Sequence, residues 1–208
     1  MYSQKFFLRC KTVPLSTEVL GFTGGDKPYF FEQTLDAKVP DIIRKHSGEN
    51  KQVLIFCPTK KSTETLCQTL ATTMGRVGNA TSVLGLASVY DEKLRNLIGK
   101  GYGNPIVNSN YFKSTLFFFV FAQTTIILAY HHAGIPADDR AFIESSFLSG
   151  GIHVLCATST LAHGVNLPAH LVIIRGTNCW RGASKGYEKM PRSMITQMCG
   201  RAGRPGRV

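Results

Sequence analysis

The sequence predicts an α/β protein built around a parallel sheet. Two continuous apolar runs, at residues 53–57 and 171–174, and the stretch 152–157, in which only His153 is polar, have the length and composition of buried strands. Pro58 ends the first run and an amphipathic stretch follows at once, which is the strand–turn–helix unit of such a sheet. We therefore expect strands and helices to alternate along the chain.

The composition is that of one globular domain with a polyanionic partner. The chain has 208 residues, and 24 basic against 13 acidic side chains give it a net charge of +11. Such an excess favours polyanions, of which nucleic acid is the commonest. The six cysteines form no C-x-x-C pair, so we expect reduced thiols, with neither a disulfide framework nor a metal site. The first residues lack the apolar core of a signal peptide.

Residues 1–38 are expected to be a linking segment with edge strands, and residues 39–208 the main domain. Short apolar patches at 19–22 and 29–31 are candidates for those strands. Pro40 fits the first position of the helix that follows, because a residue there needs no backbone N–H.

The run at 53–57 is expected to lead into a capped helix. Thr59 or Ser62 can accept a hydrogen bond from the first helical N–H groups. Apolar residues spaced four apart then form a stripe: Leu66, Leu70 and Met74. Thr59 and Lys60 follow the carboxyl end of the strand, where open α/β sheets bind ligands. An ordinary turn with solvated lysines explains this stretch equally well.

Two further helices are expected, at 91–99 and from Pro136 up to the glycines at 150 and 151. The second starts with proline and two aspartates and stops at a glycine pair. His131 and His132 precede it. Adjacent side chains of an extended segment point to opposite sides, and no acidic or cysteine partner lies at ligand spacing, so we expect no metal there.

The stretch 158–169 predicts a phosphate contact. Thr158, Ser159 and Thr160 follow a strand end and precede a short helical turn, so that hydroxyl and N–H groups converge. Gly164 and Asn166 can adopt backbone conformations that other residues resist.

The loop 175–192 is basic and rich in glycine. It carries Trp180 and Tyr187, and aromatic side chains among basic ones can stack on nucleic-acid bases. A tryptophan in a loop is as often a packing anchor.

The octet 197–204 is suited to gripping a phosphate. Ser193 can cap a short helix that carries Gln197, and Gly200 and Gly203 allow the backbone to approach a ligand closely. Arg201 and Arg204 present two guanidinium forks, which neutralise charge spread over several oxygens.

Four stretches resemble motifs of Ski-two-like helicases of superfamily 2. The octet reads Q-x-x-G-R-x-G-R, and residues 158–169 read T-S-T-L-A-x-G-V-N-L-P-A. Residues 131–140 resemble the H-H-A-G-L-x-x-x-x-R element, and residues 53–71 the motif that opens the second RecA-like domain. The loop W-R-G-x-x-x-G-Y-E-K at 180–189 is most similar to the meiotic crossover helicases of the Mer-three or HFM type.

The resemblance implies a RecA-like domain of the P-loop NTPase type, with a parallel sheet and helices on both faces. Residues 39–208 would be the second RecA-like domain of an ATP-dependent DNA helicase. Three residues would act at the ATP site as arginine fingers and their glutamine partner: Arg201, Arg204 and Gln197. Four would line the nucleotide side: Gly164, Asn166, Gly200 and Gly203. Five would contact the backbone of single-stranded nucleic acid: Thr59, Lys60, Thr158, Ser159 and Thr160.

Neither G-x-x-x-x-G-K-[ST] nor D-E-x-H occurs in the sequence. These motifs hold the phosphates and Mg²⁺. We therefore expect a fragment that is inactive alone, with ATP and Mg²⁺ bound mainly by a first RecA-like domain. Its expected partners are that domain and single-stranded or branched DNA, and no membrane. We expect it to act in the nucleus, during meiotic recombination. The alternatives are a fragment of an exosome- or spliceosome-type RNA helicase and a non-catalytic nucleic-acid-binding isoform.

Residues 102–128 have no counterpart in the resemblance. The family joins its D-x-K-L-R-x-L helix to A-Y-H-H-A-G almost directly, whereas here Gly101 and Ala129 flank a phenylalanine-rich stretch. Its apolar run is shorter than the roughly 20 residues of a membrane span. We interpret 102–128 as an atypical insert or a retained intron.

Overall fold

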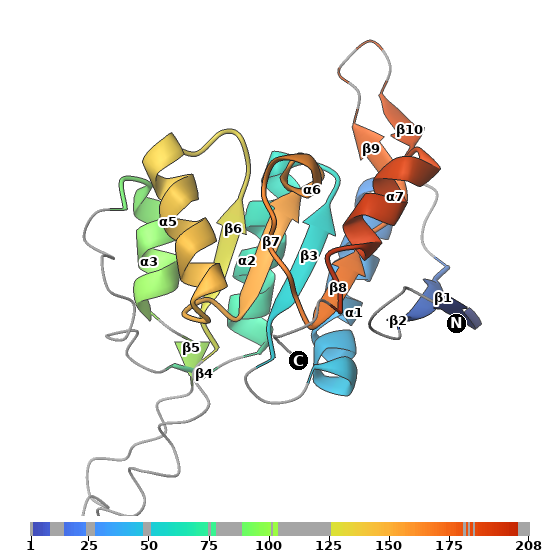
Figure 1. Ribbon diagram of the computed structural model, residues 1–208, viewed down its shortest axis with the longest axis horizontal. Helices are drawn as coiled ribbons and strands as arrows, with labels where there is room; N and C mark the ends of the chain where they lie inside the picture. The colour runs from blue at the N-terminus through green and yellow to red at the C-terminus, as the bar shows by residue number, and fades with distance from the viewer. Residues whose placement is uncertain are drawn as a thin grey trace, which may run out of the picture.

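The computed structural model has a four-stranded parallel sheet at its centre (Figure 1). It describes residues 2–8, 15–23, 28–47, 51–74, 76–77, 89–100, 102–103, 126–180, 182, 184 and 186–203. The strand order is β6-β7-β3-β8, and every neighbouring pair is parallel. The strands are β3 (Val53–Cys57), β6 (Leu128–His131), β7 (Val154–Thr158) and β8 (Leu171–Ile174). The predicted parallel α/β sheet is therefore confirmed.

Helices cover both faces of this sheet, as predicted. In Figure 1, α1 and α2 lie behind the sheet, whereas α5 and α7 lie in front of it. The helices are α1 (Pro28–His46), α2 (Lys60–Thr73), α3 (Glu92–Lys100), α5 (Ala137–Leu148), α6 (Leu161–Gly164) and α7 (Arg192–Cys199). No described helix is both long enough and apolar enough to cross a membrane.

Three small antiparallel pairs flank the parallel sheet. They are β1 (Tyr2–Leu8) with β2 (Leu15–Gly21), β4 (Arg76–Val77) with β5 (Tyr102–Gly103), and β9 (Asn178–Trp180) with β10 (Tyr187–Lys189). The last pair lies within the glycine-rich loop of the sequence, so that loop is a hairpin. The strand predicted at 19–22 is confirmed as the end of β2.

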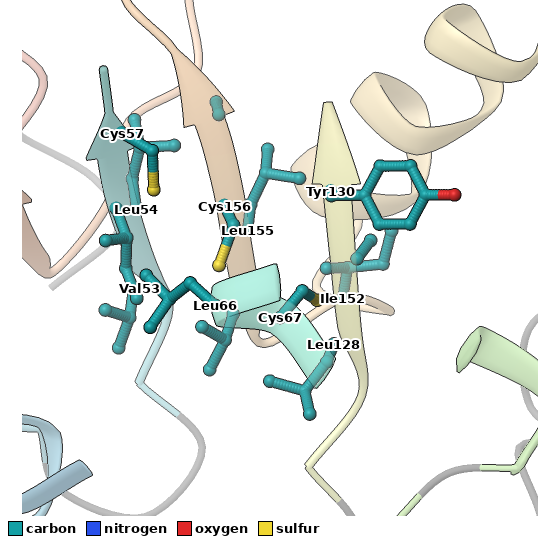
Figure 2. Packing of buried hydrophobic residues seen from close by; sticks show 14 of the residues in the cluster. Val53, Leu54, Cys57, Leu66, Cys67, Leu128, Tyr130, Ile152, Leu155 and Cys156 are labelled. Carbon is teal, nitrogen blue, oxygen red and sulfur yellow. The ribbon is translucent and has the colours of Figure 1, made fainter. Parts of the chain in front are cut away.

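The core is made of apolar side chains on the sheet and on the helices that cover it. All residues of β3 and β7 are buried. Figure 2 shows Leu66 and Cys67 of α2 packed over side chains from β3, β7 and β6. Leu66 and Leu70 of the predicted stripe are fully buried, and burying each contributes about 1.5–3 kcal/mol. Met74 lies at the C-cap and is only partly buried.

Strand β8 differs from the prediction of a fully buried strand. Only Ile173 is buried, while Leu171, Val172 and Ile174 are partly exposed. The reason is its place at the edge of the sheet, where β3 is its one neighbour among the described strands. The five cysteines that the structure describes are free thiols, namely Cys57, Cys67, Cys156, Cys179 and Cys199.

Helix α1 corrects two predictions. Residues 29–31 are helical rather than a strand, and Pro40 lies inside the helix, which begins at Pro28 instead. Val39 and Ile43, one turn apart, are buried in the core. Tertiary packing of this face stabilises the helix through Pro40, as packing does for most protein helices. The expected boundary between residues 38 and 39 falls within α1.

Two other expectations concern the start of α7 and the insert expected at 102–128. Ser193 lies inside α7, whose N-cap is Pro191 and has no side-chain cap, so the predicted cap at Ser193 is wrong. Of the expected insert, residues 104–125 lie outside the described part of the chain. Its last residue, Leu128, begins β6, and the Ile127 carbonyl accepts hydrogen bonds from the N–H groups of His153 and Val154.

Candidate functional site

The carboxyl ends of the parallel strands lie side by side at one edge of the sheet. In the strand register, Cys57 pairs with Thr158, and Phe56 pairs with both Ala157 and Ile174. On the other side, His131 pairs with Ala157. The turns that follow β3, β7 and β6 therefore leave the sheet at the same level. We call this edge, formed by residues 58–60, 158–160 and 132–136, the carboxyl edge.

Thr59 caps α2 at this edge, as predicted. Its Oγ1 atom accepts a hydrogen bond of 3.1 Å from the Ser62 N–H, and its own N–H donates one of 3.0 Å to Ser62 Oγ. This capping box uses hydroxyls that the turn would otherwise expose. Lys60 and Lys61 are exposed in the first helical turn, where the helix dipole also favours an anion.

The three hydroxyl residues after β7 differ in exposure. Thr158 is the last residue of the strand and is buried, with its Oγ1 atom 2.9 Å from the Oγ1 atom of Thr160. Ser159 is half-buried and Thr160 is exposed. The turn is closed by the Ala162 N–H, which donates to the Ser159 carbonyl at 3.1 Å. A ligand at this edge thus meets Thr160 and Ser159 first, and Thr158 holds Thr160 in position.

Arg201 is bound to the segment that follows this turn. Its Nη1 atom donates to Asn166 Oδ1 at 3.1 Å, and its Nη2 atom donates to the Ala162 carbonyl. The backbone joins the same two segments, because the Ala169 N–H donates to the Arg201 carbonyl at 2.9 Å and the Gly203 N–H to the Ala169 carbonyl at 3.3 Å. The start of the arginine-rich motif and the 158–169 motif therefore form one unit.

The other residues expected at the nucleotide side behave differently. Gly203 has φ = +66°, which requires glycine, whereas Gly200 has φ = −65° in an ordinary helical conformation. Gly164 belongs to α6 and has no positive φ, so it does not use the conformational freedom that glycine offers there. A Cβ atom on Gly164 would meet nothing within 4 Å, so this exposed position is open. Gln197 is exposed near the end of α7, and Arg204 lies outside the described residues.

The paired histidines have carboxylate partners that the sequence did not predict. His131 Nε2 lies 2.8 Å from Glu144 Oε1, and His132 Nε2 lies 3.2 Å from Glu64 Oε1. Burial lowers the pKa of His131, against the opposing effect of Glu144. The two rings have partners on different helices. Within the described ranges, no three His, Cys, Asp or Glu residues are grouped so as to hold a metal ion.

Arg175, which the sequence placed in the basic loop, is buried instead. Only 3% of it is exposed, and its guanidinium contacts Asp36 and, at 2.9 Å, Glu32 of α1. Burial raises the pKa of Asp36 even though Arg175 lies beside it. Two features of the sequence could have indicated this contact. Glu32 and Asp36 are four apart and so share one face of a helix, and Arg175 directly follows an apolar strand.

The hairpin β9–β10 is tied to the same cluster. The Tyr187 hydroxyl donates to Glu32 Oε1 at 3.1 Å, and 41% of the residue remains exposed. Stacking of Tyr187 on a base stays a prediction. The side chain of Trp180 is outside the described part of the structure.

Comparison with known proteins identifies relatives along most of the chain. Residues 90–206 match the family described as the helicase conserved C-terminal domain. A rice protein (Oryza sativa subsp. japonica) named ATP-dependent DNA helicase MER3 homolog is 33% identical over 213 residues, which cover 97% of this chain and 15% of that protein.

Two further relatives show the same pattern. ATP-dependent DNA helicase MER3 of Saccharomyces cerevisiae is 35% identical over 196 residues, covering 94% of this chain and 14% of its own length. ATP-dependent DNA helicase Hel308 of Thermoplasma acidophilum is 35% identical over 202 residues, covering 94% of this chain and 25% of its own length. The chain thus spans at most 25% of the length of these three proteins.

Proposed function

The chain belongs to the helicase conserved C-terminal domain family, in the Ski-two-like group of superfamily 2, and we propose that it is the C-terminal RecA-like half of an ATP-dependent DNA helicase. In this role it supplies arginines to an ATP site and contacts the phosphate backbone of single-stranded nucleic acid. The observation that carries the proposal is the contact of Arg201 with Ala162 and Asn166, directly after the hydroxyl-rich turn. A shift of Arg201 toward a nucleotide would therefore be transmitted to the turn at 158–160.

The nucleic-acid contact is proposed at the carboxyl edge. Thr59, Lys60, Ser159 and Thr160 lie at the ends of adjacent strands, and the strand register supports a common surface for them. Thr158 supports Thr160 through the hydroxyl contact of 2.9 Å. Hydroxyls, helix N-termini and lysines bind phosphate oxygens without reading sequence. Binding is therefore expected to weaken with salt and to tolerate any base sequence.

The nucleotide contact is proposed for Gln197, Arg201 and Arg204, with Gly164, Asn166, Gly200 and Gly203 nearby. When held by a neighbouring RecA-like domain, Mg²⁺–ATP supplies the phosphoryl group that is transferred to water. The open surface over Gly164 supports an approach of that domain, because a Cβ atom there would meet none of the described atoms of this chain within 4 Å. Guanidinium donors from this chain would then stabilise the charge that develops on the phosphoryl oxygens.

DNA as the substrate is proposed from the relatives, three of which are named as ATP-dependent DNA helicases of the MER3 type. A role in meiotic recombination and action in the nucleus are proposed from the resemblance of the loop at 180–189 to the meiotic crossover helicases. The net charge of +11 supports a polyanionic partner but does not favour DNA over RNA. Because the motifs that hold Mg²⁺ and the phosphates, G-x-x-x-x-G-K-[ST] and D-E-x-H, do not occur in this sequence, we assign Mg²⁺ to the neighbouring domain.

The ATP site can be tested by complementation. The chain alone is expected to hydrolyse no ATP, whereas the chain joined to a first RecA-like domain with a P-loop is expected to show DNA-stimulated hydrolysis. Arg201→Ala and Arg204→Ala should each reduce that rate by about 10³-fold or more, the range known for arginine fingers. DNA-stimulated turnover by the chain alone, abolished by Arg204→Ala, would contradict the proposal.

The nucleic-acid contact can be tested separately by fluorescence anisotropy with single-stranded DNA and RNA of matched sequence. The chain should bind both with strong salt dependence, and Lys60→Ala should lower the slope of log affinity against log salt by about 0.7, the value for one contact with a single strand. Tighter binding to RNA would favour an RNA helicase over a DNA helicase. No binding to either would exclude the contact.

A further inference from the structure

His132 lies beneath the turn that follows β6, and both of its ring nitrogens are engaged. The Gly134 N–H donates to Nδ1 at 3.0 Å, and Nε2 lies 3.2 Å from Glu64 Oε1 of α2. A backbone N–H can only donate, so Nδ1 must be the acceptor and the hydrogen must be on Nε2, directed at Glu64. The ring therefore links the turn to α2 in one specific tautomer.

The ring is also held in place by packing. His132 is 4% exposed, and its ring stacks on that of Tyr130 with centroids 5.5 Å apart and an interplanar angle of 12°. The Tyr130 hydroxyl donates to Asp91 Oδ1 at 3.0 Å, so the stacking partner is itself fixed. A stacked ring that is engaged at both nitrogens defines where the turn above it lies.

The turn at Gly134 lies against the side chain of Lys60. Gly134 is exposed and has no positive φ, yet a Cβ atom there would lie 3.1 Å from His132 Nδ1 and 3.4 Å from Lys60 Cδ. The glycine is needed for close approach and not for an unusual backbone. The aliphatic part of Lys60 therefore runs alongside the turn that His132 holds, and Lys60 as a whole is exposed at the carboxyl edge.

We propose that His132 is a positioning residue for the nucleic-acid contact, acting through the Gly134 turn on Lys60. The ligand class is the phosphate backbone of a single strand, and the inference rests on the nucleic-acid contact of the proposed function. His132 touches no phosphate itself. By accepting the hydrogen bond from the Gly134 N–H, its Nδ1 atom fixes the position of the turn. The turn in that position restricts the directions that the Lys60 side chain can take.

Two substitutions at His132 separate this role from a general loss of packing. His132→Asn retains an acceptor close to the position of Nδ1, whereas His132→Gln retains a polar group near Nε2 and loses that acceptor. Anisotropy with a single-stranded oligonucleotide should show affinity close to that of the unmodified chain for Asn and a loss of about two- to fivefold for Gln, the worth of one exposed ionic contact. His170→Gln is the matched control, because His170 is exposed and precedes β8 at the opposite end of that strand.

The decisive measurement is a double-mutant cycle with Lys60→Ala. If His132 acts through Lys60, His132→Gln should cause no further loss of affinity in the Lys60→Ala chain, since coupled residues are not additive. Equal losses in both backgrounds, or an Asn variant as weak as the Gln variant, would overturn the inference while leaving the proposed function intact. Failure of the unmodified chain to bind any single strand would overturn both.

Discussion

The Nη1 atom of Arg201 donates a hydrogen bond of 3.1 Å to Asn166 Oδ1, across 35 positions of sequence. This contact joins the arginine-rich motif to the segment that leads out of the hydroxyl-rich turn. Because the Nη2 atom also binds the Ala162 carbonyl, the guanidinium plane is held at two points. A movement of Arg201 at the proposed nucleotide side would therefore also move the segment next to the proposed nucleic-acid contact.

We predict that Arg201 and Asn166 are energetically coupled. Asn166→Ala should lower the free energy of unfolding by about 1 kcal/mol, the usual net worth of one hydrogen bond. In the Arg201→Ala chain the same change should have a smaller effect, because its partner is already gone. Urea unfolding of the four chains measures this coupling. Strictly additive losses would mean that the contact contributes nothing.

Replacing the buried Arg175 should destabilise the chain far more than replacing an exposed arginine. Arg175→Met leaves Asp36 and Glu32 without their buried cation, and breaking such a pair costs about 3–5 kcal/mol. Arg192→Ala, at an exposed position of α7, should change stability by no more than about 0.5 kcal/mol. Comparable urea midpoints for the two variants would show that the buried cluster is not needed for stability.

The cap of α2 should be separable from any ligand contact of Thr59. Thr59→Ser retains a hydroxyl that can accept from the Ser62 N–H, whereas Thr59→Ala removes it and should cost about 1 kcal/mol. Urea unfolding, without nucleic acid, measures the capping term alone. A Ser variant as unstable as the Ala variant would assign the loss to the methyl group instead.

Two glycines of the site should respond in opposite ways to alanine. Gly203→Ala forces a Cβ onto a backbone with φ = +66° and should destabilise the chain by about 1 kcal/mol. Gly164→Ala adds a methyl group in open space within a helical turn, and should leave stability unchanged or raise it by up to about 1 kcal/mol. In the two-domain protein, however, Gly164→Ala should slow ATP hydrolysis if the neighbouring domain packs there. An unchanged rate of ATP hydrolysis would show that the neighbouring domain does not pack on the surface at Gly164.

Acid should destabilise the chain through two histidines. Burial lowers the pKa of His131 and His153 below the ordinary value of 6.5. Just below pH 6.5 the unfolded chain therefore binds protons that the folded chain does not, so stability present above that pH is lost as the pH falls. The slope is at most about 1.4 kcal/mol per pH unit for each histidine.

The contribution of His153 can be isolated. Its Nδ1 atom accepts a hydrogen bond of 3.3 Å from the Ile127 N–H, which protonation would remove. His153→Asn retains an acceptor and does not titrate, so urea unfolding between about pH 5.5 and 7.5 should show a shallower dependence. An unchanged slope would assign the acid sensitivity to other groups.

Local patterns in the sequence are enough to predict most of the elements. The apolar run Val53–Cys57, the cap at Thr59 and the helix that starts after Pro136 each depend on residues within a few positions of one another. The motif at 158–169 likewise indicates the hydroxyl-rich turn, because the end of a strand and the start of a helix each depend on residues that are close together in the sequence. Burial periodicity and capping are short-range effects, so a short window contains them.

The pairs that organise the site depend on tertiary structure instead. Arg175 meets Asp36 across 139 positions, His132 meets Glu64 across 68, and Arg201 meets Asn166 across 35. Pro40 lies within a helix for a similar reason, because the packing of the whole α1 face outweighs its local preference for a helix start. The sequence by itself determined which segments become strands and helices and which motifs leave their ends. The strand order and the docking of α1 decided which charge meets which partner, because an ion pair forms wherever folding brings two groups within a few ångströms, however distant they are along the chain.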